Sequence, residues 1–170
     1  MRKIPVGTFG GSVEIDRRSL YITTSWWLQY ATAAKLYNYR PGGKLVPEVA
    51  SRFTVSQRGT RYTFFLRTGF RFSDGKAVTA AHFKYAFDRL KSPELASPGA
   101  GFAHNVRSVR ARGNRLIVDL TRPDERLVSK LTLPFFQATS TKLPLDREVR
   151  EVRSRATFPR PVRTPSRGTR

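Results

Sequence analysis

The side chains that could perform acid–base or metal chemistry are few in this 170-residue sequence, and they stand apart from one another. His82 falls in a predicted helix and His104 in a predicted loop 22 positions later, so they do not form a metal-binding pair. Asp74 could be a general base, but it precedes Gly75, and this pair is typical of a turn because glycine adopts positive φ without steric cost. The sequence therefore predicts no metal site and no catalytic acid or base.

Two further patterns could suggest phosphate binding or nucleophilic catalysis, and both lack essential parts. The segment 41–44 reads PGGK, but it has neither the preceding strand nor the following Ser or Thr that a phosphate-binding loop requires. Serines such as Ser25 have no nucleophile-elbow motif around them and no acid and base partners. Because the chain contains no cysteine, a thiol nucleophile is also excluded. We expect a non-enzymatic protein with no cofactor.

The composition is that of a folded and strongly basic protein. Hydrophobic residues make up 39% of the chain, while 24 arginines and 8 lysines against 12 acidic residues give a net charge of +20. Contacts of such side chains with phosphates release counterions, so a basic nucleic-acid-associated protein is the alternative function. Most arginines are scattered singly, as are Arg107, Arg110 and Arg112, which fits solvated faces as well as a binding stripe. No specific nucleic-acid partner is expected.

The first half of the chain combines a helical pattern with a strand pattern. Aromatic and apolar residues recur at roughly helical spacing over residues 26–39, which predicts a helix that ends before Pro41. Residues 56–60 have the composition of a turn. Strict alternation then predicts a strand over residues 62–67, with both faces partly covered.

The second half continues with a helix, a hairpin and a short helix. Thr79 is a predicted N-cap, and four apolar residues at positions i, i+3, i+4 and i+7 form one face of the helix after it: Phe83, Ala86, Phe87 and Leu90. Residues 106–111 and 116–120 flank a Gly-Asn turn and are predicted to pair as a hairpin. A short helix is predicted from Pro123 through Leu131. The fold class is therefore mixed α/β, or α+β.

The stretch of residues 62–90 resembles the signature region of the family 5 extracellular solute-binding proteins, the peptide- and nickel-binding components of ABC importers. The usual pattern is a Tyr-Thr-Phe-x-Leu-Arg strand, a glycine, an aromatic-basic-Phe segment, Ser-Asp-Gly, and Val-Thr-Ala opening a helix. These parts correspond here to residues 62–67, Gly69, 70–72, 73–75 and 78–80. The resemblance extends from about Ser25 to about Arg153.

The resemblance implies a fold and a function. The fold is part of a two-lobed, class II periplasmic-binding-protein-like fold, and it is incomplete. The function is that of a substrate-binding component that takes up a peptide, or nickel or another small solute, and delivers it to an ABC importer permease in the membrane. The implied location is the cell envelope, in the periplasm or on the extracellular face of the membrane.

The resemblance also implies that three segments contribute ligand contacts. The loop before the first helix offers Thr24 and Trp26, and the loop after the signature helix offers Phe102. The segment after the short helix offers Phe136 and Gln137. Each has a structural alternative, since Trp26 and Phe136 are also typical core aromatics and Thr24 is a typical helix cap.

The ends of the sequence lead to three further expectations. Residues 1–153 are interpreted as the N-terminal part of the family domain, and residues 154–170 as an Arg- and Pro-rich disordered tail. Because that tail resembles no binding-protein lobe, we expect a truncated product of a longer gene. No apolar run of signal-peptide length precedes Gly7, so the sequence itself does not predict export.

Overall fold

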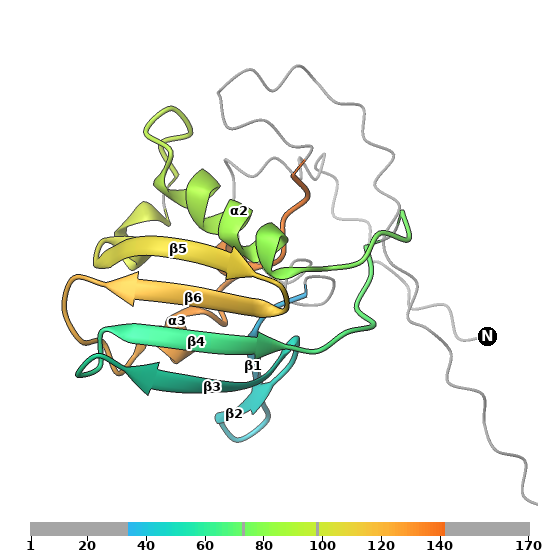
Figure 1. Ribbon diagram of the computed structural model, residues 1–170, viewed down its shortest axis with the longest axis horizontal. Helices are drawn as coiled ribbons and strands as arrows, with labels where there is room; N and C mark the ends of the chain where they lie inside the picture. The colour runs from blue at the N-terminus through green and yellow to red at the C-terminus, as the bar shows by residue number, and fades with distance from the viewer. Residues whose placement is uncertain (1–33, 73, 98, 142–170) are drawn as a thin grey trace, which may run out of the picture.

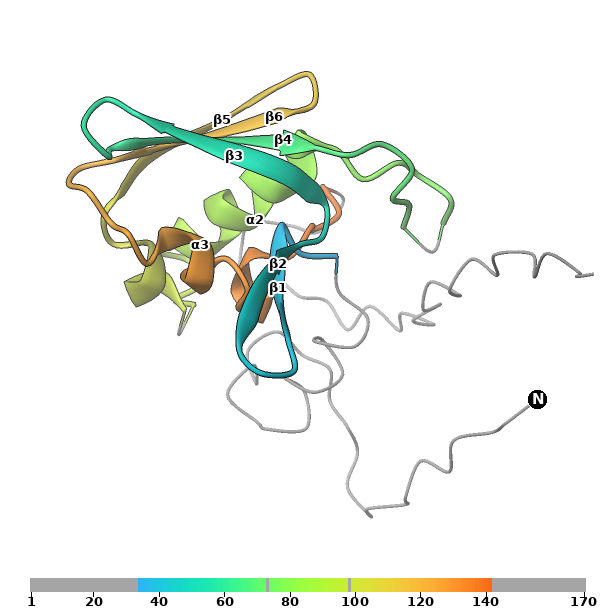
Figure 2. The ribbon, with the colours of Figure 1, turned by 90° about the horizontal axis from the view of Figure 1, so that it is seen from below.

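The computed structural model describes residues 34–72, 74–97 and 99–141 (Figure 1). One layer is an antiparallel sheet of four strands in the order β3-β4-β6-β5. The helices lie on one face of this sheet (Figure 2). The strands are β3 (Ala50–Ser56), β4 (Arg61–Leu66), β5 (Val106–Arg112) and β6 (Arg115–Leu120). The helical elements are α2 (Ala80–Lys91), α3 (Leu127–Lys130) and the 3-10 helices η2 (Ala100–Ala103) and η3 (Pro134–Phe136).

A separate hairpin replaces part of the first predicted helix. Strands β1 (Tyr37–Arg40) and β2 (Lys44–Pro47) pair in antiparallel register. Residues 34–36 are also not helical. The helix predicted over residues 26–39 is therefore wrong for its described part, while residues 26–33 lie outside the described ranges.

Turn chemistry and packing together explain why the hairpin forms. Gly42 and Gly43 adopt φ values of 85° and 75°, which glycine tolerates and which reverse the chain between the strands. The ring of Tyr37 packs edge-on against Phe53 and Phe64, with centroids 5.7 and 6.3 Å away. This contact with the sheet outweighs the local helical spacing of the apolar residues.

Strand β4 confirms the alternation read from the sequence. Tyr62, Phe64 and Leu66 are buried on the face that carries the helices, and the intervening residues are only partly buried. The turn predicted at residues 56–60 is also confirmed, because residues 57–60 reverse the chain between β3 and β4.

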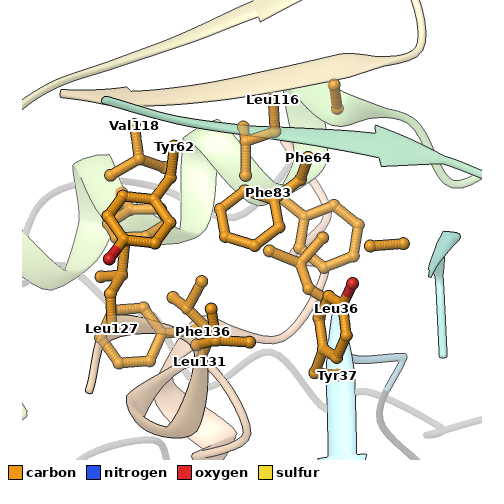
Figure 3. Packing of buried hydrophobic residues seen from close by; sticks show 14 of the residues in the cluster. Leu36, Tyr37, Tyr62, Phe64, Phe83, Leu116, Val118, Leu127, Leu131 and Phe136 are labelled. Atoms are coloured by element: carbon orange, nitrogen blue, oxygen red, sulfur yellow. The ribbon is translucent and has the colours of Figure 1, made fainter. Parts of the chain in front are cut away.

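Helix α2 covers the inner face of the sheet with the predicted apolar face. All four residues of that face are buried, namely Phe83, Ala86, Phe87 and Leu90. Together with the inner residues of β4 and β6 and the apolar residues of α3 and η3, they form one core (Figure 3). These residues of the signature region are therefore part of the scaffold.

The aromatic-basic-Phe segment of the signature, residues 70–72, does not form a full strand. Only one bridge, between Arg71 and Ala77, links the two sides of the loop. At its tip Gly75 adopts a φ of 82°, and the Lys76 N–H donates to the Asp74 carboxylate at 3.1 Å. Asp74 and Gly75 thus form the predicted turn.

The β5–β6 hairpin is confirmed, whereas the helix after it is shorter than predicted. Pro123 does not start α3, which begins at Leu127. The Asp124 carboxylate explains this, because it accepts hydrogen bonds from the Arg126 N–H at 3.1 Å and from Lys130 Nζ at 2.6 Å. These bonds hold a turn where the sequence pattern indicates a helix. None of the helices in the described ranges is long and apolar enough to cross a membrane.

The buried face of α2 provides a test of this packing. Phe87 is 1% exposed and its ring lies 5.0 Å from that of Phe136, so Phe87→Ala leaves a cavity in the core. We expect the free energy of unfolding, measured by urea denaturation, to fall by about 3–5 kcal/mol. The same change at the exposed Phe53 should cost clearly less. Equal losses in the two variants would contradict the placement of α2.

Candidate functional site

The described ranges contain three of the five predicted ligand-contact residues. Phe102 lies in η2, Phe136 ends η3, and Gln137 follows it. Thr24 and Trp26 lie outside the described residues, so their role stays a prediction.

The loop after α2 and the segment around η3 lie against each other. The half-buried ring of Phe102 stacks on that of Phe135, with centroids 5.8 Å apart and planes 26° apart. A Cβ on Gly99 would lie only 2.6 Å from the Phe135 ring and 3.0 Å from Leu90 Cδ1. Glycine is therefore required for this close approach. The fold thus brings two of the three predicted contact segments together.

The two residues at the end of η3 differ in exposure. Phe136 is 1% exposed and packs on Phe87, so its observed contacts are those of a core residue. Gln137 is half-buried and extended, at the point where the chain leaves the core. A ligand contact by either residue stays a prediction. The geometry favours Gln137, because it is half-buried as a residue, although its Oε1 atom is buried.

Backbone hydrogen bonds hold the segment that contains Gln137. The Ala138 N–H donates to the Ala34 carbonyl at 2.9 Å, and the Thr139 N–H donates to the His82 carbonyl at 3.1 Å. The Thr139 hydroxyl also donates to the Gln137 carbonyl at 3.2 Å. The segment is therefore fixed between the first turn of α2 and the chain entering β1. The sequence analysis did not predict these hydrogen bonds, because their acceptors are backbone carbonyls, which every residue has.

His82 stabilises the start of α2 through its side chain. Its Nδ1 accepts a hydrogen bond from the Thr79 N–H at 3.1 Å, which is the role that a Glu or Gln plays in a capping box. The ring also contacts Phe72 edge-on, with centroids 4.8 Å apart. Burial lowers the pKa of His82, although the bond with Thr79 and the charge of Asp74 act in the opposite direction. The neutral ring is therefore the form that caps the helix.

Arg89 is a polar residue that sequence reasoning also missed. Its Nη1 atom is buried and makes no hydrogen bond within the described structure. Arg89 lies seven positions, or about two helical turns, after His82, and hence on the same side of α2. Arg89 as a whole is half-buried. Because a buried N–H without a partner is costly, an acceptor oxygen would be a favourable partner for this one nitrogen. The burial of this atom depends on packing, which the sequence does not show.

Within the described ranges no three His, Asp or Glu residues are close enough to hold a metal ion. Asp119 and Asp124 are instead engaged with basic side chains, Arg61 and Arg110 in one case and Lys130 in the other. What the η2 and η3 segments offer to a ligand is an aromatic shelf and an amide.

Residues 44–162 match the family model of bacterial extracellular solute-binding proteins, family 5 Middle, which is more than half of the chain. The chain belongs to this family. Its members are binding proteins, so the resemblance stated from the signature region is confirmed. The family membership gives no support to the nucleic-acid alternative.

Individual relatives cover only parts of the chain. The probable deoxycholate-binding periplasmic protein of Escherichia coli is 40% identical over 60 residues, which is 35% of this chain and 11% of that protein. The periplasmic murein peptide-binding protein of the same species is 40% identical over 68 residues, covering 40% of this chain and 12% of that protein.

A solved structure agrees with the fold. The Haemophilus influenzae OppA complex with the peptide RPPGFSPFR matches with a TM-score of 0.65 and 25% identity, over 69% of this chain and 26% of that one. The family member described here thus spans about a tenth of the curated relatives and about a quarter of the solved structure. The predicted class, a mixed α/β part of the class II binding-protein fold, is confirmed.

The capping role of His82 predicts a pH-dependent stability. Because folding lowers the pKa of this imidazole, its contribution is complete above about pH 6.5 and is lost as the pH falls through the lower, folded-state value. His82→Gln retains an acceptor for the Thr79 N–H but does not titrate. We expect the unfolding free energy of the wild type to fall more steeply than that of the variant between about pH 7.5 and about pH 5.

The second histidine supplies the control for this measurement. His104→Gln removes an imidazole ring from an exposed position in the loop after η2. This variant should keep the steeper, wild-type pH dependence. If His104→Gln and not His82→Gln flattened the profile, the assignment to His82 would be wrong.

Proposed function

We propose that this chain is part of the substrate-binding component of an ABC importer, which binds a peptide or another small solute and delivers it to a membrane permease. The observation that carries the proposal is the family match over residues 44–162. The proposed role is binding without turnover, outside the cytoplasm in the cell envelope, where the named Escherichia coli relatives are periplasmic. In such a protein the ligand would stabilise the closed arrangement of the lobes through the contacts that it makes only when they close around it.

The contact surface that we propose on this chain is the shelf of Phe102 and Phe135 together with Gln137. Phe102 is half-buried, so one face of its ring is covered by Phe135 and apolar ring area remains for a ligand. Gln137 can both donate and accept hydrogen bonds, as recognition of peptide groups requires. The backbone bonds of residues 138 and 139 hold this surface in place before a ligand arrives.

We further propose that the ligand combines an apolar body with a carboxylate. The relatives are named for deoxycholate and for a murein peptide, and the solved complex holds the peptide RPPGFSPFR. Each of these ligands can combine apolar groups with a carboxylate. On this chain the aromatic shelf would contact the apolar part. The guanidinium of the half-buried Arg89, whose Nη1 atom makes no hydrogen bond within the described structure, would pair with the carboxylate.

Titration followed by amide chemical shifts tests the proposed contact surface, because it detects weak as well as tight binding. On addition of the peptide RPPGFSPFR, we expect the largest shifts in residues 99–103 and 134–139. Phe102→Ala and Gln137→Ala should each weaken binding by about tenfold, as expected for the loss of one good contact. Phe53→Ala, which removes an exposed ring on β3, should leave the affinity unchanged. Shifts confined to other elements would contradict the proposed surface.

A second titration tests the role of Arg89 separately. The wild type should bind the peptide acid about tenfold more tightly than its C-terminal amide, because only the acid pairs with the guanidinium. Arg89→Gln should abolish this difference, whereas Arg126→Gln, an equal loss of charge at an exposed position, should retain it. Retention of the acid preference in Arg89→Gln would refute this role and leave the proposed contact surface intact.

A further inference from the structure

One face of the four-stranded sheet is not covered by any described element, since the helices lie on the opposite face (Figure 2). We call it the outer face. The strand registers place its residues in three cross-strand rows. In the order β3, β4, β6, β5, the rows are Arg52, Phe65, Arg115 and Arg112; Thr54, Thr63, Ile117 and Arg110; and Ser56, Arg61, Asp119 and Ser108.

The outer face carries a strong excess of positive charge. Five arginines stand against one carboxylate, so the net charge is five minus one, or +4. That carboxylate, Asp119, is already engaged by Arg61, Arg110 and the Ser108 hydroxyl. These partners hold its pKa below the usual value, although burial acts in the opposite direction. Asp119 therefore remains ionised and organises one end of the face.

The other end of the outer face has arginines without acidic partners. Arg52 lies over the Phe65 ring with its guanidinium carbon 3.6 Å from the centroid, and Arg115 approaches the same ring at 5.4 Å. Arg115 and Arg112 are direct cross-strand neighbours, and none of the described carboxylates forms an ion pair with Arg52, Arg112 or Arg115. Like charges placed directly opposite are destabilising, so this row has an electrostatic cost that an anionic partner would remove.

We propose that the outer face docks on an anionic phospholipid surface. Strands about 4.8 Å apart display the arginines on a broad sheet surface, which suits an array of phosphates in a plane. Each basic residue near such a surface adds to the attraction. Single-stranded nucleic acid would instead use exposed rings as stacking platforms, and the only ring on this face, Phe65, is flanked by two guanidinium groups. This proposal does not depend on the identity of the transported solute.

Vesicle co-sedimentation of the full chain tests the proposal. We expect binding to phosphatidylcholine vesicles that contain about 30% phosphatidylglycerol, little binding to pure phosphatidylcholine, and weakening as salt rises from about 0.05 to about 0.3 M. The triple variant Arg52→Gln, Arg112→Gln, Arg115→Gln should bind the anionic vesicles at least about tenfold more weakly. It retains Asp119 and its two partners, and an unchanged thermal melt would show that it folds.

A charge-matched variant separates this face from the high net charge of the whole protein. Arg40→Gln, Lys44→Gln, Arg126→Gln removes the same three charges from exposed positions on β1, β2 and the turn before α3. It should bind anionic vesicles within about twofold of the wild type. The proposal would be overturned if the two triple variants lost equal vesicle affinity, or if the affinity for vesicles with and without phosphatidylglycerol were the same. Clearly tighter binding to duplex DNA at the same salt would overturn it as well.

Discussion

The described structure depends on burying the apolar rings of one sheet face under α2, α3 and η3. Phe64 of β4 and Phe83 and Phe87 of α2 are almost completely enclosed, and Phe136 of η3 completes the contact with α2. Among the described elements, the helices and the short two-stranded sheet of β1 and β2 are what cover the inner face, and Tyr37 of β1 packs there on Phe64. Every other feature, including the position of the candidate contact surface, follows from this two-layer packing.

The proposed contact surface takes its geometry from the core. Phe135 and Phe136 are adjacent, so the packing of Phe136 on Phe87 fixes where Phe135 can meet Phe102. The His82 carbonyl, in the first turn of the same helix, then accepts the Thr139 N–H. Because these contacts all start from α2, the signature helix acts as the common support of segments that are far apart in sequence. Rigid support of this kind holds a contact surface in place before a ligand arrives.

The sequence predicted an element correctly where its local residue pattern agreed with the packing that the element has in the fold. The alternation of β4, the apolar face of α2 and the Gly-Asn turn between β5 and β6 were all predictable from the sequence. The predicted helix over residues 26–39 failed in its described part, because the contacts of Tyr37 with the sheet come from distant residues. The burial of Arg89 and the backbone partners of residues 138 and 139 could not be predicted either, since they depend on how the elements pack.

The strand register links the core to the charged outer face. In β4 the buried Tyr62, Phe64 and Leu66 alternate with Arg61, Thr63 and Phe65, so a slip by one residue would exchange the two sets and bury an arginine. Both edge strands contain an irregularity, between Ala50 and Arg52 in β3 and between Val106 and Ser108 in β5. Such bulges disrupt edge pairing with other chains. The same register that encloses the aromatic core therefore also aligns the arginines in rows, so the two surfaces of this sheet cannot vary independently.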